Sequence, residues 1–141
     1  MGNVTGVDDL IKNLSRIATD KVVTEAVTDA ALQVRGHAIR EINKQSRGVT
    51  YQRGGITHTA SAPGDAPNTD TGTLVNSIAV ETPQPKTAFV GTSLKYGLWL
   101  EIGTGRMAAR PWLRPAGDRG HKDLPKTIAQ AIRRNIQQVS K

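Results

Sequence analysis

The chain has 141 residues and a net charge of +7, with 37% apolar residues, 4% aromatic residues and no cysteine. This length predicts one domain with a modest core of mainly Leu, Ile, Val and Ala, and the lack of cysteine excludes a disulfide framework and a cysteine-ligated metal. No run approaches the ~20 apolar residues that span a bilayer, and Met1 to Thr5 lack the basic and apolar regions of a signal peptide. We therefore expect a soluble protein that is neither exported nor bound to a membrane.

The excess of positive charge lies entirely in the last quarter of the chain. Residues 106–141 carry nine Lys or Arg and two Asp or Glu, whereas residues 1–45 and residues 46–105 are each balanced. Such asymmetry is typical of a protein that meets an acidic partner, either nucleic acid or an acidic protein surface. A solvated basic helix face that favours solubility explains the same pattern. The composition leaves these three interpretations open.

Residues 7–45 are predicted to form one long amphipathic helix. Apolar residues recur every three or four positions, no proline interrupts the range, and Asp8 and Asp9 suit a helix N-terminus. Unbroken, this helix would be about 57 Å long, which is more than a globule of this size covers. We expect either a bend near Thr19–Thr24 or packing of the helix on a neighbouring subunit, and an ordinary two-helix hairpin explains the pattern equally well.

Residues 46–72 are predicted to form a long extended loop. Glycine alternates with Ser, Thr, Pro and Asn, and only Val49, Tyr51 and Ile56 are sizeable apolar residues. A loop of about 25 residues exceeds the usual limit of ~12–15 for a structureless connection. The residues before Pro63 and Pro67 avoid the helical region, which favours an extended course. We interpret the segment as an arm that becomes ordered on a partner, and a flexible insertion is the alternative.

Residues 73–92 are predicted to form a β-hairpin. The first strand covers Leu74–Val80, the second covers Lys86–Gly91, and the prolines of Thr82–Pro85 make the turn. Two strands alone are marginally stable, so the hairpin should pack on the long helix or on strands of neighbouring copies.

Residues 94–102 return to helical spacing, because Leu94, Leu98 and Ile102 are four residues apart. Glu101 lies among apolar residues, which makes it a candidate for a buried carboxylate that must be paired. Its candidate partners are the arginines that follow it, Arg106, Arg110 and Arg114.

The remaining residues are predicted to form a short helix at 111–118 and a C-terminal helix at 123–139. Pro111 and Pro115 each suit a first helical turn, and Asp123 is a candidate N-cap with Pro125 behind it. The fold class is therefore α+β: a long N-terminal helix and a C-terminal helix pack on a small antiparallel sheet, with a long extended loop.

The sequence indicates no enzyme, cofactor or metal site. His37, His58 and His121 lack the spacing of metal ligands. Residues 103–106 read Gly-Thr-Gly-Arg and follow a helix, so they lack the Gly-Lys-Ser/Thr and the preceding strand of a phosphate loop. Two glycines after a helix are more simply its C-terminal stop and a turn.

Several blocks in residues 61–116 resemble one known family. In chain order they are Ala62-Pro63-Gly64-Asp65-Ala66-Pro67, Asp70 to Ile78, Val90-Gly91-Thr92, Tyr96 to Thr104 and Met107 to Ala116. Together they resemble the neck or tail-completion family of long-tailed phages, the gene-product-ten family of Hong Kong ninety-seven, which is related in role to the minor tail protein Z of lambda. Tyr96-Gly97 and Pro111-Trp112 stand where that family usually has Tyr-Ala and Pro-Phe.

The resemblance implies a structural virion protein without enzymatic activity, assembled in the host cytoplasm and located at the head–tail junction. It implies a ring, hexameric if it matches the tail tube, that joins the tail to the connector and lets DNA pass. The implied partners are further copies of the chain, the connector or stopper, the tail terminator or tail tube, and DNA in the lumen. A stopper or tail-terminator ring of the same neck is an alternative. A small basic DNA-binding module, with affinity that falls steeply with salt, is another.

Two sets of residues are the predicted contact sites. The first set is expected to line assembly interfaces and consists of Tyr51, Arg53, Pro63, Asp65, Pro67, Glu101, Arg106, Arg110, Trp112 and Arg114. The second set is expected to face DNA or an acidic protein and consists of Arg119, Lys122, Arg133 and Arg134.

Overall fold

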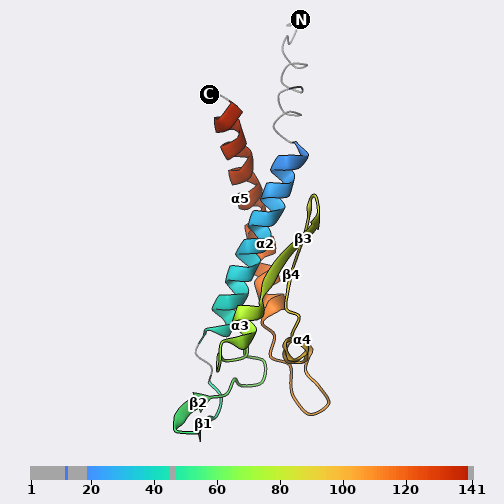
Figure 1. Ribbon diagram of the computed structural model, residues 1–141. Coiled ribbons are helices and arrows are strands. Elements are labelled where there is room, and N and C mark those ends of the chain that lie inside the picture. Colours follow the sequence, from blue (N-terminus) through green and yellow to red (C-terminus); the bar gives the residue numbers. More distant parts are fainter. Residues whose placement is uncertain (1–11, 13–18, 45–46, 140–141) are drawn as a thin grey trace, which may run out of the picture.

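The computed structural model describes residue 12, residues 19–44 and residues 47–139. Its elements are α2 (Asp20–Ile42), β1 (Thr50–Arg53), β2 (Ile56–Thr59), α3 (Thr73–Ser77), β3 (Ala79–Gln84), β4 (Thr87–Gly91), α4 (Lys95–Ile102) and α5 (Leu113–Val139). The predicted α+β class is confirmed, because two long helices pack on each other beside two small antiparallel sheets of two strands each (Figure 1). No helix in the described ranges is long and apolar enough to cross a membrane.

Helices α2 and α5 run antiparallel along the length of the molecule, and the β3–β4 hairpin lies beside α2 (Figure 1). Two hydrogen bonds hold this hairpin to the helix. Near its turn, Lys86 N donates to Thr24 Oγ1 (3.2 Å), and at its base Arg35 Nε donates to Ile78 O (2.7 Å). An isolated two-stranded sheet is marginal, so α2 supplies the support that the sequence predicts for this hairpin.

The core is thin and consists of two separate clusters. The larger one joins α2, α3 and α5 and contains Ala38, Ile42, Leu74, Ile78, Trp112 and Ala116. The smaller one lies nearer the start of α2 and contains Val22, Ala26 and Ala131. Most of these side chains are aliphatic, as the composition predicts, and the one aromatic member of the two clusters is Trp112.

The first helix differs from the prediction at both of its described ends. Thr19 has an extended backbone (φ −66°, ψ 155°), so α2 begins at Asp20, in the region where a bend was expected. The helix ends at Ile42 rather than at residue 45, and the N–H of Asn43 closes its last turn. The predicted start at Val7 lies outside the described residues.

The predicted extended loop at residues 46–72 contains a hairpin that the sequence analysis missed. Strands β1 and β2 pair antiparallel, from Thr50 opposite Thr59 to Arg53 opposite Ile56. Gly54 and Gly55 form the turn with positive φ angles of 57° and 82°, which suits a two-residue type I′ turn. The Gly54–Gly55 pair is the sequence feature from which this hairpin could have been predicted. The strands themselves contain Thr, Gln and His, so they show no clear alternation of apolar and polar residues.

Residues 60–72 have no regular structure, yet they are fixed to the rest of the chain. Gly64 N donates to Ala109 O (3.0 Å), and Ser61 and Pro67 are buried. At the root of the β1–β2 hairpin, Ala60 N donates to Val49 O (2.9 Å). The hairpin, rather than the whole range 46–72, is therefore the part that projects from the lower end of the molecule in Figure 1.

The prediction of a first strand at Leu74–Val80 is wrong for most of its length. Residues 73–77 form α3 and β3 begins only at Ala79, so the turn lies at Pro85–Lys86 and not at Thr82–Pro85. Leu74 and Ile78 are both buried, and a spacing of four fits a helical turn as well as a strand face. The second strand begins at Thr87, one residue after its predicted start.

The C-terminal third contains one long helix where two were predicted. The short helix at 94–102 is confirmed as α4, but the predicted helices at 111–118 and 123–139 are both parts of α5, with Pro125 inside it. Asp123 is not an N-cap, because its carboxylate contacts His37 of α2. Pro125 removes one backbone hydrogen bond, and packing along α2 offsets that loss.

Gly120 lets α5 approach α2 closely. A Cβ at this position would lie 2.2 Å from Cγ2 of Val34. We expect Gly120→Ala to lower the free energy of unfolding by about 1 kcal/mol, because an overpacking cost of about 1–3 kcal/mol exceeds the gain in helix propensity. Urea denaturation checks this, with Gly117→Ala as the matched control, since nothing lies within 4 Å of a Cβ there and the substitution should stabilise. A stabilised Gly120→Ala variant would contradict the close helix approach.

Candidate functional site

A ladder of four polar contacts runs along the seam between α2 and α5. Its members in α2 are spaced four residues apart, which places them on one face of that helix. They are Asp29, Gln33, His37 and Glu41, and they contact Arg134, Thr127, Asp123 and Arg119 of α5, in that order. We call these eight residues the seam ladder. It fixes the register of the two helices over most of the length of α2.

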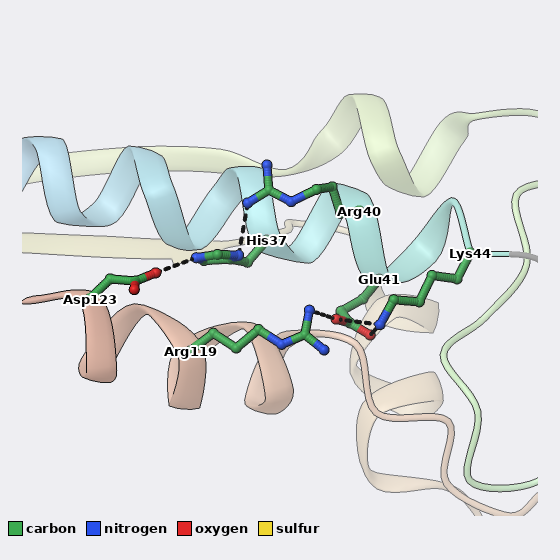
Figure 2. A network of polar contacts seen from close by, with 6 residues as sticks. All are labelled: His37, Arg40, Glu41, Lys44, Arg119 and Asp123. Carbon is green, nitrogen blue, oxygen red and sulfur yellow. Dashed lines mark hydrogen bonds and ion pairs between the residues drawn. The ribbon is translucent and has the colours of Figure 1, made fainter.

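His37 lies inside the seam ladder between two charged groups (Figure 2). Its Nε2 is 2.9 Å from Asp123 Oδ2, and its Nδ1 is 2.8 Å from Arg40 Nη2. A guanidinium group has donors and no acceptor, so Nδ1 must accept and Nε2 carries the hydrogen that is donated to Asp123. Both helices therefore orient the ring and select one tautomer.

Glu41 is 7% exposed and is held between two cations (Figure 2). Lys44 Nζ lies 2.9 Å from Oε1 and 2.8 Å from Oε2, and Arg119 forms an ion pair with Oε1. A buried carboxylate needs such partners. Arg119, which was predicted to face DNA or an acidic partner, thus neutralises a residue of its own chain.

The seam ladder divides the predicted basic set into two pairs. Arg134 forms an ion pair with Asp29, so it too is neutralised internally, like Arg119. Lys122 and Arg133 are exposed and form no ion pair with any residue that the structure describes. Only this second pair keeps its charge for a partner.

Glu101 binds the first turn of α5 from the neighbouring helix α4. Its Oε2 accepts hydrogen bonds from the backbone N–H groups of Trp112 and Leu113, and Oε1 accepts one from Arg114, each at 2.8 Å. The expected arginine side-chain partner is wrong: the carboxylate binds the partial positive charge of a helix N-terminus instead. Glu101 therefore connects two helices of its own chain.

Trp112 is a second predicted interface residue with an internal role. Its side chain is 1% exposed, and its Nε1 donates to the backbone O of Gly97 (3.0 Å). A Cβ on Gly97 would lie 2.6 Å from Thr92 Cγ2 and 3.6 Å from the Trp112 ring. The two positions at which this chain departs from the phage-family pattern thus contact each other, and Trp112 is not available to a neighbouring subunit.

The predicted interface residues of 46–72 fall on both sides of the hairpin root. Tyr51 and Arg53 lie on the exposed β1 strand, where Tyr51 packs edge-on against His58, with 5.3 Å between ring centroids. Arg53 Nη1 is 3.8 Å from a carboxylate oxygen of Asp70. Beyond the root, Pro63 and Asp65 are exposed and Pro67 is buried.

The three predicted arginines between α4 and α5 have different environments. Arg106 and Arg114 are exposed. The Nε of Arg110 is buried and has no hydrogen-bond partner among the described residues, while its backbone N–H donates to Leu100 O (2.7 Å). These residues lie in and after the loop that begins at Gly103, where α4 ends as the glycine signal predicted.

Two groups of large apolar side chains are uncovered. Leu98, Trp99 and Ile102 are between 51% and 65% exposed, and we call them the α4 apolar face. On the β1–β2 hairpin and just before it, Ile56 and Val49 are 71% and 76% exposed. The sequence predicted the apolar character of 94–102, but it gave no sign that one side of this helix would stay uncovered.

Neither a metal site nor a known relative assigns a chemical activity to these surfaces. Within the described ranges, no group of three or more His, Asp or Glu residues could hold a metal ion. A scan against protein-family models finds no match, and a search of curated proteins and of solved structures finds none either.

Proposed function

We propose that the chain is a structural subunit of a phage head–tail junction, which forms a ring with further copies of itself and joins the tail to the connector. The resemblance of the blocks in residues 61–116 to the neck and tail-completion family supports this proposal. The observation that carries it is the α4 apolar face, which stays exposed in the single chain.

Covering the α4 apolar face would contribute substantially to association. Full burial of a large apolar side chain contributes about 1.5–3 kcal/mol, so three side chains that are already partly covered would contribute roughly 1 kcal/mol each. Exposed Trp, Leu and Ile side chains that adjoin on one helix are typical of the centre of a protein interface. Glu101, through its bonds to α5, holds this face in a fixed orientation.

The β1–β2 hairpin is the candidate arm between neighbouring subunits. It projects at the same end of the molecule as α4 (Figure 1) and exposes Ile56, with Val49 at its root. Because Ala60 N donates to Val49 O (2.9 Å), the two strand ends lie side by side, so residues 50–59 can be replaced by a short glycine linker. The replacement also removes the contacts of Thr59 with Asn68 and of Arg53 with Asp70. A deletion that reached residue 66 would also remove the buried Ser61.

The proposal is tested by the oligomeric state of variants in native mass spectrometry. We expect the natural chain to form a discrete ring, alone or on isolated phage tails, and the double variant Leu98→Asp, Ile102→Asp to stay monomeric with an unchanged circular dichroism spectrum. The matched control is Ile128→Asp, Ile136→Asp, two α5 side chains that are each 41% exposed, which should still assemble. Replacement of 50–59 by the linker should weaken the ring in the same way as the α4 variant if the hairpin is the arm.

A natural chain that stays monomeric both alone and with isolated tails would contradict the ring. If the ring binds isolated heads rather than tails, the chain is a stopper at the connector instead of a tail-completion protein.

A further inference from the structure

After the internal ion pairs are set aside, three of the four remaining Lys and Arg residues of α5 lie on one side of the helix, and the fourth is Arg114 in its first turn. Lys122, Lys126 and Arg133 are spaced by four and seven residues, which are one and two helical turns, and all three are exposed. Arg40 of α2 is also exposed, and its guanidinium contacts a histidine nitrogen rather than a carboxylate. None of these four has an ion pair within the described part of the chain. We call them the basic stripe.

The basic stripe borders a groove between α2 and α5. Two open hollows of about 520 and 480 Å³ lie along the seam, and they share Leu32, Gln33 and Gln130 as wall residues, so they form one continuous groove. Arg133 lines the first hollow, and Arg40 and Lys126 line the second.

Both carboxylates in the groove walls have a partner in the seam ladder, but only Asp29 is neutralised by a cation. Asp29 is paired with Arg134, and Asp123 accepts a hydrogen bond from His37. The seam ladder therefore has an electrostatic consequence: it cancels the charge of Asp29 and engages Asp123 in a hydrogen bond, so the four cations outnumber the one wall carboxylate that keeps its charge. An anionic ligand would therefore meet a net positive charge in this groove.

We infer that this groove binds the phosphate backbone of duplex DNA. Lys122 and Arg133 are eleven residues apart in α5. That separation is about 16 Å along the helix, or about five base pairs of duplex. The wall amides of Gln33, Gln130 and Gln137 can donate to phosphate and sugar oxygens beside the cations. The groove offers charge and hydrogen-bond donors along a line, which is the pattern of backbone contact without base recognition.

An acidic protein surface fits the same cations less well. Protein interfaces place apolar anchors at their centre, and Leu32 is the one large apolar side chain in the described walls of this groove. The α4 apolar face, by contrast, places three large exposed apolar side chains next to one another. The inference does not rest on the proposed ring, because a single chain carries the whole groove.

Fluorescence anisotropy with a labelled duplex of about 30 base pairs tests the inference through its salt dependence. Four phosphate contacts predict a slope of about −3.6 in log affinity against log salt, which is roughly 150-fold weaker binding at about 200 mM than at about 50 mM. The triple variant Lys122→Gln, Lys126→Gln, Arg133→Gln should reduce the slope to about −1 and weaken binding about 100-fold at low salt.

The control variant Lys21→Gln, Arg53→Gln, Lys95→Gln removes the same number of exposed charges outside the groove and should keep nearly the natural slope. If the two triple variants lose the same amount of DNA affinity, net charge alone explains the binding and the proposed site is wrong. No binding of the natural chain at low salt would overturn it as well. The third adverse outcome is tighter binding of polyglutamate than of DNA through the same three residues, which would make the groove a protein-docking surface. Because the substituted side chains are exposed, circular dichroism should show unchanged folding in both variants.

Discussion

Replacing Trp112 with alanine is expected to lower the free energy of unfolding by about 3–5 kcal/mol. The indole is fully buried in the larger core cluster, where residues of α2, α3 and α5 meet around it. Alanine would leave a cavity that the surrounding helices cannot close, and it would also remove the donor to Gly97 O. A domain of this kind has only about 5–15 kcal/mol of total stability, so one substitution would remove a large fraction of it.

Urea denaturation followed by far-ultraviolet circular dichroism measures this loss, and the expected fall in Tm is about 10–15 °C. The chain has two tryptophans, and the other one, Trp99, is 51% exposed, so Trp99→Ala is a control with the same change of side chain. We expect the control to cost less than about 1 kcal/mol. If the two variants differ by less than that amount, Trp112 is not the centre of the core.

The two helices that the sequence predicts correctly are recognised from the spacing of their apolar residues. Over residues 20–42, and again over 95–102, apolar residues recur at helical spacing, and α2 and α4 occupy these ranges. The period of a helix is a property of the segment itself, so a short stretch of sequence contains the whole signal. The α+β class follows from these helices and from the strand at Thr87–Gly91.

The sequence-based predictions are wrong where two secondary structures both fit the local sequence and a contact with a residue far away in the chain decides between them. Asp123 and Pro125 favour a new helix start, yet α5 continues through them, since Gly120 lies against Val34 and Asp123 bonds to His37 of α2. Leu74 likewise fits a strand or a helix locally, and its burial in the larger core cluster selects the helix. Such choices depend on residues far away in the chain, which a local pattern does not contain.

The pairing of charges in the candidate sites also depends on residues that are far apart in the sequence. The sequence assigns nine basic residues to the last quarter of the chain, but it does not show that Arg119 and Arg134 neutralise Glu41 and Asp29 of α2. Arg134 and Asp29 are 105 residues apart, and no local spacing connects them. The charge available to a partner is therefore smaller than the composition indicates, and part of it lies along one side of the helix pair as the basic stripe.

The proposed contact surfaces consequently differ in chemistry and in position. The α4 apolar face suits a neighbouring protein, whereas the basic stripe suits a polyanion, and the two lie on different helices. Glu101 and Trp112 both join α4 to the start of α5, and Glu101, with three hydrogen bonds, contributes the larger share of the link between the two surfaces.

Replacing Glu101 with alanine is expected to lower the free energy of unfolding by about 2–4 kcal/mol. An α-helix leaves four N–H groups without partners at its start. In α5 the carboxylate binds three of them, those of Trp112, Leu113 and Arg114, and the fourth position is Pro115, which has no N–H group. Alanine would leave these three N–H groups without a hydrogen-bond partner at a half-buried helix end. It would also remove the negative charge that stabilises the helix N-terminus.

Glu101→Gln keeps an acceptor but loses the charge, so we expect about half of the alanine effect, because charge-assisted hydrogen bonds are roughly twice as strong as neutral ones. Glu81→Ala, at an exposed position of β3, is the matched control and should cost less than about 0.5 kcal/mol. Hydrogen exchange gives the local readout: in the alanine variant, the amides of Leu113 and Arg114 should lose protection before the rest of α5. Retained protection at these two amides would mean that water or another side chain caps the helix equally well, and that packing and the Trp112–Gly97 hydrogen bond hold α4 in place.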